Sequence, residues 1–206
     1  MSQPTNVNAL LFDLGGVLID WDPRYLYRPL FQGDDAAMER FLAEVCPPEW
    51  NRQMDAGRPF DDAIAERQHL YPQHAHLIGL WKIGWSQMLG EQIHETVAVV
   101  DALRKRGRRL YALTNWSAET FPVARDRFDF LQWFEDIVVS GEVNLAKPDP
   151  RIFELTLERC GLTPESTLFV DDMRPNVEVA RGLGLHALHF ENPRKLRTDL
   201  EQLSLL

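Results

Sequence analysis

A short apolar run that ends in an acidic residue near the start of the chain constrains the fold most. Residues 9–12 (Ala-Leu-Leu-Phe) are followed by Asp13 and then by Gly15 and Gly16. Apolar residues without polar alternation are typical of a strand buried on both faces of a parallel sheet. Ligands bind at the carboxyl ends of such strands, where glycine allows a sharp turn. We therefore expect Asp13 to face a ligand, although an Asp that merely opens a turn is the alternative.

The second half of the chain alternates predicted strands with predicted helices. Strands are expected over residues 109–115, 137–140, 167–170 and 185–190, with helices near 97–107, 119–128, 151–160 and 177–182. This alternation is typical of an α/β fold with a doubly wound parallel sheet. Right-handed crossovers then bring the strand ends to one edge.

Between the first strand and this alternating region, the pattern is helical. Residues 23–92 show no convincing strand run, and Pro23 suits the first turn of a helix. We expect residues 23–92 to form a helical cap domain inserted into a core domain of residues 1–22 and 93–206. Within residues 76–88, predicted as one helix, Trp81 and Trp85 are interpreted as cap core or as a dimer surface. A monomer or a homodimer is expected.

Three predicted strands end in polar residues: Asp13, Thr114 with Asn115, and Asp171 with Asp172. Lys147 lies just before a predicted helix. Each of these could simply cap a helix or form a turn. At one sheet edge, however, the three carboxylates would repel one another unless a divalent cation neutralised them, and oxygen ligands favour Mg²⁺. Lys147 and the polar groups of Thr114 and Asn115 could then hold phosphoryl oxygens, which indicates phosphoryl transfer.

These segments together resemble the haloacid dehalogenase superfamily of hydrolases, in its branch with a helical (C1-type) cap. The matching segments are residues 11–18, 113–115, 146–150 with Phe153, and 169–172 with Asn176 and Ala180. The resemblance implies that Asp13 is a nucleophile that forms an aspartyl-phosphate and that Lys147 offsets charge beside it. It also implies that Thr114 and Asn115 hold the phosphoryl group. The implied Mg²⁺ ligands are Asp13, the Gly15 carbonyl, Asp171 and Asp172.

One position departs from the pattern of most phosphatases in this superfamily. They carry a second Asp two residues after the nucleophile as a general acid and base, whereas this chain has Gly15. Loss of such a group typically costs about 10²- to 10⁴-fold in rate. The Asp-Leu-Gly-Gly-Val form resembles the α-D-glucose-1-phosphate phosphatase-like branch, which implies a Mg²⁺-dependent phosphatase acting on a small metabolite such as a sugar phosphate.

Two other functions stay open at this stage. In a 2-haloacid dehalogenase the same Asp13 would attack carbon, but that reaction needs no divalent metal and leaves Asp171 and Asp172 without a purpose. A catalytically weak protein that binds a phosphorylated ligand is the other alternative, supported by Gly15. Substrate choice is assigned to the segment around Trp50, Asn51 and Gln53, because donors beside an aromatic ring suit a binding pocket. An ordinary connection between two cap helices is the alternative.

The charge and composition of the chain bound its partners. The net charge of −9 disfavours nucleic acid, because no basic stripe is available to neutralise phosphates. No apolar run is long enough to span a membrane, and the first residues lack the features of a signal peptide. The two cysteines, Cys46 and Cys160, are far apart and fit a reduced protein. We expect a cytoplasmic protein whose partner is a small phosphorylated molecule.

Overall fold

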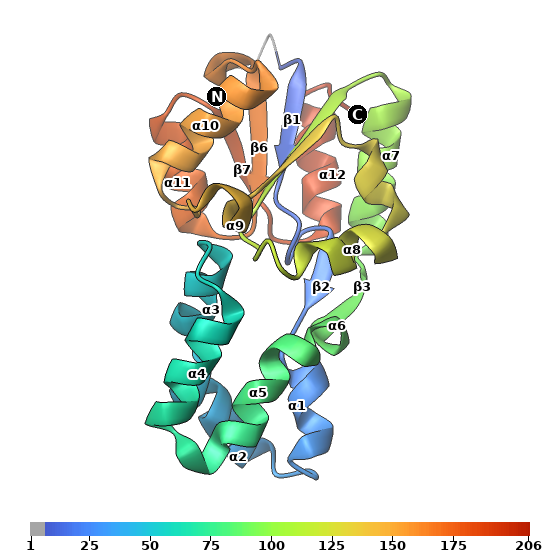
Figure 1. Ribbon diagram of the computed structural model, residues 1–206. Coiled ribbons are helices and arrows are strands. Elements are labelled where there is room, and N and C mark those ends of the chain that lie inside the picture. Colours follow the sequence, from blue (N-terminus) through green and yellow to red (C-terminus); the bar gives the residue numbers. More distant parts are fainter. Residues whose placement is uncertain (1–6) are drawn as a thin grey trace.

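A five-stranded parallel sheet forms the centre of the larger lobe (Figure 1). The computed structural model describes residues 7–206. The strand order is β5-β4-β1-β6-β7, and the bounds are Ala9–Phe12 for β1, Arg109–Thr114 for β4, Asp136–Val139 for β5, Thr167–Asp171 for β6 and His186–His189 for β7. The predicted α/β fold with a doubly wound parallel sheet is therefore confirmed. The central place of β1 puts Asp13 between the ends of β4 and β6.

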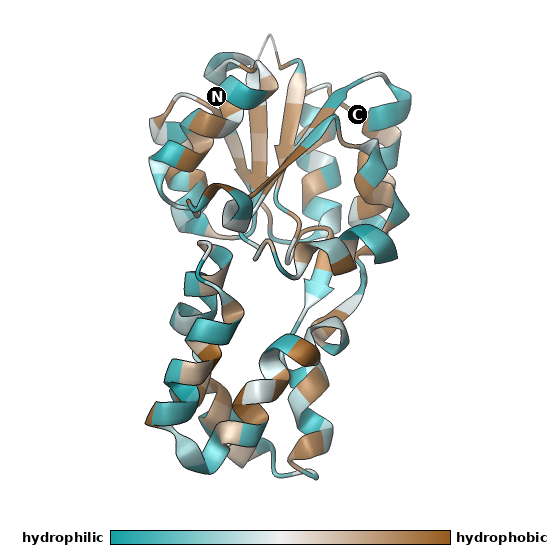
Figure 2. Ribbon diagram, in the orientation of Figure 1, coloured by the Kyte–Doolittle hydropathy of each residue, from teal (hydrophilic) through white to brown (hydrophobic). Residues whose placement is uncertain are grey.

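Alternate residues of β1 pack on opposite faces of the sheet, as the pleat requires. Leu10 and Phe12 belong to one apolar cluster, and Leu11 belongs to a second. Helices α7 (His94–Lys105) and α12 (Pro193–Gln202) cover the first face, and α10 (Pro150–Cys160) and α11 (Arg174–Gly182) cover the other (Figure 1). The strands are hydrophobic along their length (Figure 2), as burial on both faces demands. The remaining helices of this lobe are α8 (Phe121–Arg127) and α9 (Ser140–Val143), with short 3₁₀ turns at Asp129–Trp133 and Pro164–Ser166.

A separate group of helices forms the smaller lobe (Figure 1). Its bounds are α1 Arg24–Leu30, α2 Asp35–Arg40, a π-helical turn Phe41–Val45, α3 Pro48–Asp55, α4 Phe60–Leu70, a 3₁₀ turn Pro72–His74, α5 Ala75–Ile83 and α6 Trp85–Met88. The single helix predicted over residues 76–88 is divided at Gly84. A Cβ atom there would lie 2.7 Å from Leu26 Cδ2 and 2.8 Å from the Leu80 carbonyl, so glycine permits close packing against α1.

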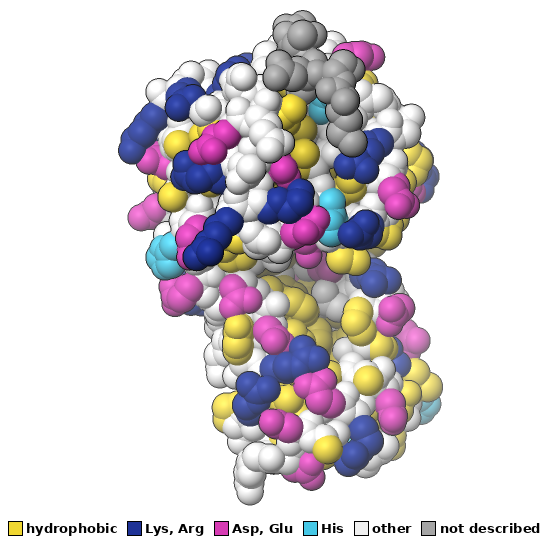
Figure 3. Space-filling model, turned by 180° about the vertical axis from the view of Figure 1, so that it is seen from behind, with side chains coloured by type: hydrophobic (Ala, Val, Ile, Leu, Met, Phe, Trp, Pro, Cys, Tyr) yellow, Lys and Arg dark blue, Asp and Glu magenta, His cyan; other side chains and the backbone are white. Residues whose placement is uncertain are grey.

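Two short antiparallel strands connect the lobes. These are β2 (Ile19–Trp21) and β3 (Leu89–Gln92), where the sequence predicts no strand at the end of the helical segment. That part of the prediction was wrong, because a four-residue strand containing Gly90 and Glu91 has little β propensity of its own and is stabilised by pairing with β2. None of the helices in residues 7–206 is long and apolar enough to cross a membrane. On the face in Figure 3, acidic and basic side chains are intermixed.

Candidate active site

Lys147 links the ends of β1 and β6. Its Nζ atom lies 2.9 Å from Asp13 Oδ2 and 2.7 Å from Asp171 Oδ2, and its side chain is fully buried. Burial by itself lowers the pKa of Lys147, but the carboxylates of Asp13 and Asp171 outweigh this effect and raise that pKa overall. Residues more than 100 positions apart in the sequence therefore meet at one sheet edge, as expected for a parallel sheet.

Asp13 is held at the end of β1 with little exposure to solvent. Its Oδ1 accepts a hydrogen bond from the Leu14 backbone N–H at 2.7 Å. Burial raises the pKa of Asp13 to about 8, with Asp171 and Asp172 adding to the effect and Lys147 opposing it. Three carboxylates and one lysine leave this site with excess negative charge. A divalent cation bound here would favour the ionised form of Asp13, the form that acts as a nucleophile.

The carboxylates of Asp13, Asp171 and Asp172 form the cluster expected for a metal. Each offers an oxygen atom, and the three atoms lie within 4.8 Å of one another. A cluster of carboxylate oxygens fits a hard cation such as Mg²⁺. Asp171 also accepts hydrogen bonds from the Met173 backbone N–H and the Asn176 amide, which fixes its orientation. Asp172 is less buried and lines the cavity described below.

The two glycines after Asp13 differ in what they allow. Gly16 has a φ of +71°, and a Cβ atom there would lie 2.7 Å from Asp172 Oδ2, so a side chain is excluded on both counts. Gly15 has no such φ, and a Cβ atom there would meet nothing within 4 Å. Gly15 also lines the cavity. The position of the usual acid and base is therefore open space beside Asp13.

Asn115 positions the lysine through its backbone. The Asn115 side-chain amide donates to the Lys147 carbonyl at 2.9 Å and accepts from the Lys147 N–H at 2.8 Å. Asn115 lines the cavity, whereas Thr114 is buried at the end of β4 beneath it. Asn115 therefore has a structural role in addition to the expected role in phosphoryl binding. The residue pattern does not reveal the structural role, because that role depends on a contact between two loops.

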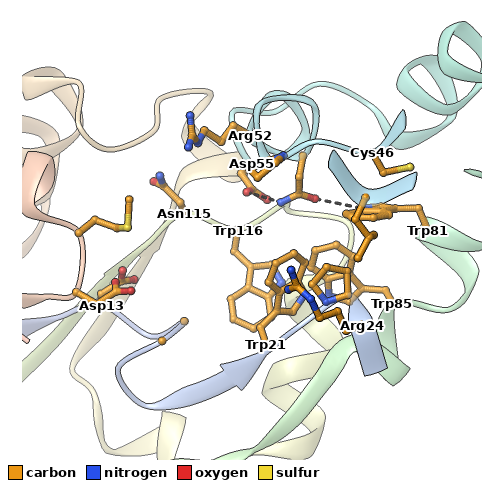
Figure 4. A pocket seen from close by; sticks show the side chains of 18 of the residues that line it. Asp13, Trp21, Arg24, Cys46, Arg52, Asp55, Trp81, Trp85, Asn115 and Trp116 are labelled. Carbon is orange, nitrogen blue, oxygen red and sulfur yellow. Dashed lines mark hydrogen bonds between the residues drawn. The ribbon is translucent and has the colours of Figure 1, made fainter. Parts of the chain in front are cut away.

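A cavity of about 710 Å³ runs from these residues into the helical lobe. Figure 4 shows Asp13 on one side of the cavity and Trp21, Trp81 and Trp85 on another, with Asn115 between the two groups. Figure 3 shows hydrophobic side chains in the hollow between the lobes. Trp81 and Trp85 are buried in the apolar cluster of the helical lobe, in agreement with the cap-core interpretation, and both also line this cavity.

Of the three residues predicted to select the substrate, Asn51 is the one that lines the cavity. Its amide accepts from Trp81 Nε1 at 3.1 Å and donates to Asp55 Oδ2 at 2.9 Å (Figure 4). Trp50 packs in the apolar cluster against Trp81, with ring centroids 5.3 Å apart. Gln53 accepts a hydrogen bond from Arg58 at 2.5 Å. Trp50 and Gln53 are not among the residues that line the cavity, so the contacts just described assign them structural roles instead.

Asp55 is a buried acidic residue within residues 50–58, the segment to which substrate choice is assigned, although the sequence gives it no separate role. It lies at the end of α3, where its carbonyl accepts from Ser140 Oγ at 2.5 Å and so joins the two lobes. Burial raises the pKa of Asp55 to about 7, while the Ser117 backbone and Arg52 oppose the shift. An acidic residue at the end of an otherwise ordinary helix carries no sequence signal of its own, because the contact with Ser140 comes from the opposite lobe.

Comparison with known families decides the class of this protein. The family model for haloacid dehalogenase-like hydrolases matches residues 7–184. The chain belongs to this family. It is therefore a hydrolase, and the enzyme class predicted from the resemblance is confirmed. The match does not assign the chain to the α-D-glucose-1-phosphate phosphatase-like branch, and it does not assign the C1 type of cap.

Curated relatives include phosphatases of different substrates. The sesquiterpene phosphatase astK of Aspergillus oryzae is 25% identical, covering 97% of each chain. The phosphorylated carbohydrates phosphatase of Thermotoga maritima is 26% identical over 89% of this chain and 84% of the relative. Mouse acyl-CoA dehydrogenase family member 10 is 33% identical over 57% of this chain, and the match spans 11% of that protein.

Solved structures share the fold. A magnesium complex of the HAD family enzyme bt-2542 from Bacteroides thetaiotaomicron has a TM-score of 0.70 at 23% identity, covering 91% of this chain and 94% of that one. The L-2-haloacid dehalogenase RSc1362 has a TM-score of 0.75 at 18% identity, covering 96% of this chain and 100% of that one. At these identities the likeness concerns the fold alone.

Proposed function

We propose that this hydrolase is a Mg²⁺-dependent phosphatase that cleaves phosphate monoesters of small organic molecules. The observation that carries the proposal is the bridge from Lys147 to both Asp13 and Asp171, with Asp172 beside them at the base of a large cavity. A buried cation next to a carboxylate nucleophile suits an anionic substrate that would otherwise be repelled. The phosphatases among the curated relatives support the same class of reaction.

In the proposed reaction, a carboxylate oxygen of Asp13 attacks phosphorus, and the bond between phosphorus and the ester oxygen breaks. The alcohol leaves with a proton taken from water, and a second water molecule then hydrolyses the acyl phosphate to release inorganic phosphate. Lys147 stabilises negative charge on the phosphoryl oxygens. Asn115 borders the cavity, and Thr114, buried at the end of β4, is assigned to phosphoryl binding from the resemblance. Mg²⁺, held by Asp13, the Gly15 carbonyl, Asp171 and Asp172, would neutralise phosphoryl charge.

We further propose residues 23–92 as a C1-type cap and residues 1–22 and 93–206 as the core, in the glucose-1-phosphate phosphatase-like branch. Support comes from the two lobes and the Asp-Leu-Gly-Gly sequence at Asp13. The three-carboxylate cluster favours phosphate over a haloacid, because displacement of halide needs no divalent metal and would place an anionic substrate among further negative charges. Sugar phosphates are one substrate class that the branch implies.

Phosphate release from p-nitrophenyl phosphate tests the proposal. Turnover should require Mg²⁺, stop on addition of EDTA and fall at least about 10³-fold in Asp13→Asn, which removes the nucleophile but keeps its size. Release of halide from 2-chloropropionate should stay at background. An Asp13→Asn variant with near wild-type turnover, or activity indifferent to EDTA, would contradict the mechanism. Binding of phosphate without turnover by the wild type would instead support the ligand-binding alternative.

A further inference from the structure

The wall of the cavity that lies in the helical lobe is apolar. Trp21 at the end of β2 and Trp81 and Trp85 from α5 and α6 form its aromatic part (Figure 4). Trp21 and Trp85 lie with ring centroids 5.5 Å apart, and Trp21 and Trp81 lie 6.5 Å apart, so the three rings pack as one cluster in which Trp21 is the most exposed ring. The remaining apolar lining of this wall is Pro23, Leu42, Ala43, Cys46 and Pro48.

Arg24 and Asn51, two of the polar residues on this wall, are already paired within the protein, whereas the exposed Arg52 has Glu49 at 3.7 Å. The Arg24 guanidinium lies 2.6 Å from Glu39 and 3.2 Å from Asp22. Both ends of the Asn51 amide are engaged, one with the Trp81 indole and the other with Asp55. A substrate rich in hydroxyl groups would therefore find few free hydrogen-bond partners here to replace its bonds to water, which costs binding energy.

The volume of the cavity indicates the size of the bound molecule. At about 710 Å³ it lies well inside the range of pockets that enclose drug-sized ligands. A two- or three-carbon phosphate attached at Asp13 would leave the accessible part of this wall, including Trp21 and Ala43, in contact with water. A larger apolar body would cover the surface and gain hydrophobic free energy from the area removed from water.

From this cavity we infer the substrate class: a phosphate monoester of a bulky apolar alcohol, with an aliphatic or aromatic body of roughly ten carbon atoms or more. The phosphoryl group lies against Asp13 and Lys147, and the apolar body lies against Trp21, Trp81 and Trp85. The inference rests on the proposed phosphatase function and specifies its leaving group. It favours apolar alcohols over the sugar phosphates that the sequence resemblance implies.

A series of n-alkyl monophosphates from ethyl to decyl measures the effect of the apolar body alone. The alcohols of this series share nearly the same acidity, so the chemical step is constant and only the buried chain grows. With Mg²⁺ present, kcat/KM should rise by about three- to fourfold per added methylene until the cavity is filled. Glucose 1-phosphate should be a poorer substrate than octyl phosphate. A flat or falling series, or a sugar phosphate that matches octyl phosphate, would overturn the inference.

Variants locate the effect in the cavity. Trp21→Ala should reduce the ratio of kcat/KM for octyl over ethyl phosphate at least about tenfold, since it removes the most exposed of the three aromatic rings that line the cavity. Trp133→Ala is the matched control, because Trp133 packs partly buried under Arg104 and is outside the cavity lining. Ala43→Trp places a new ring at an exposed lining residue, where folding is little affected, and should lower the same ratio.

A binding measurement separates this inference from the proposed function. Titration of the same alkyl phosphates into the Asp13→Asn variant with Mg²⁺ should give a dissociation constant that falls with chain length. If no ester of any kind is hydrolysed by the wild type while this trend is present, the phosphatase proposal fails and the apolar cavity assignment stands. If acetyl phosphate is hydrolysed but neither affinity nor kcat/KM depends on chain length, the phosphatase proposal stands and the apolar cavity assignment fails.

Discussion

The two walls of the cavity are held in place by different kinds of interaction. On the core side, Asp13, Lys147 and Asp171 are each fixed by hydrogen bonds or ion pairs below 3 Å, and all three are buried. On the helical side, Trp21 and Trp85 are positioned by packing against other rings. Displacing a charged group would disrupt the core wall, whereas substituting side chains in the helical wall would change the shape of the cavity. Chemistry is thus assigned to the sheet edge and substrate choice to the helices.

The largest effect is expected from Lys147→Met, which removes the cation from the core wall. Asp13 and Asp171 would then be buried without a charge partner, so the free energy of unfolding should fall by about 3 to 5 kcal/mol. Phosphatase turnover should be lost as well. Urea denaturation at neutral pH and phosphate release measure the two effects.

Lys195→Met is the matched control for that experiment. Lys195 is 42% exposed and pairs with Asp199 at 2.8 Å, so its loss should cost about 1 kcal/mol or less. A Lys147→Met protein as stable as Lys195→Met would show that the buried ion pairs do not hold the core wall. A second variant, Lys147→Met combined with Asp171→Asn, should recover part of the stability but none of the activity.

A smaller effect is expected from Gly15→Asp, which adds a proton-transfer group to the core wall. Without an acid at this position, negative charge develops on the departing oxygen, so the rate should depend steeply on the acidity of the alcohol. The new carboxyl has space, and it should accelerate alkyl phosphates by about tenfold or more while changing p-nitrophenyl phosphate less. Rates for a series of phenyl phosphates of graded acidity measure this slope.

Gly15→Asn is the size-matched control, since it cannot transfer a proton as a carboxyl does. The rate of Gly15→Asn should depend on the acidity of the alcohol as steeply as the rate of the wild type does. Equal slopes for the wild type, Gly15→Asn and Gly15→Asp would mean that proton transfer to the alcohol comes from another group of the enzyme. A loss of Mg²⁺ binding in Gly15→Asp would show instead that the added charge disturbs the carboxylate cluster.

The last prediction concerns the effect of pH on Asp55, which lies where the helical lobe meets the core. Its pKa of about 7 is raised by burial above the value near 4 of an unfolded chain. Between these values the folded state binds more protons, so Asp55 makes the free energy of unfolding fall as pH rises, by up to about 1.4 kcal/mol per pH unit, with no further fall above pH 7. Asp55→Asn should remove this contribution.

Urea denaturation of the wild type and Asp55→Asn from pH 5 to pH 8 tests the point. The wild type should lose stability relative to the variant as pH rises towards 7, and the difference should then level off. Two curves that run parallel over this range would show that Asp55 ionises as freely in the folded protein as in the unfolded chain.

The core was largely predictable because its signals are local. Each buried strand is a continuous apolar run, and Asp13, Asn115 and Asp171 follow directly from strand ends. Parallel pairing then brings these ends together without knowledge of any helix. The proximity of Lys147 to two carboxylates follows the same rule, although its double contact required coordinates.

The helical lobe was less predictable because its roles depend on which face of a helix meets the cavity. Trp50 and Trp81 are both buried aromatic residues in the sequence pattern, yet only Trp81 of this pair lines the cavity. β3 forms through pairing with β2, and Asp55 makes one of its contacts with Ser140 of the other lobe. Such assignments are set by tertiary packing, which no local pattern encodes.

The chain enters and leaves the helical lobe at one place. Asp22 N–H bonds to the Met88 carbonyl, and Ile93 N–H bonds to the Leu18 carbonyl, so the two connecting segments are fastened side by side. The helices that face the cavity are therefore inserted between two adjacent points of the core. Substitutions within them would change the alcohol side of the cavity while the register of the parallel sheet is kept.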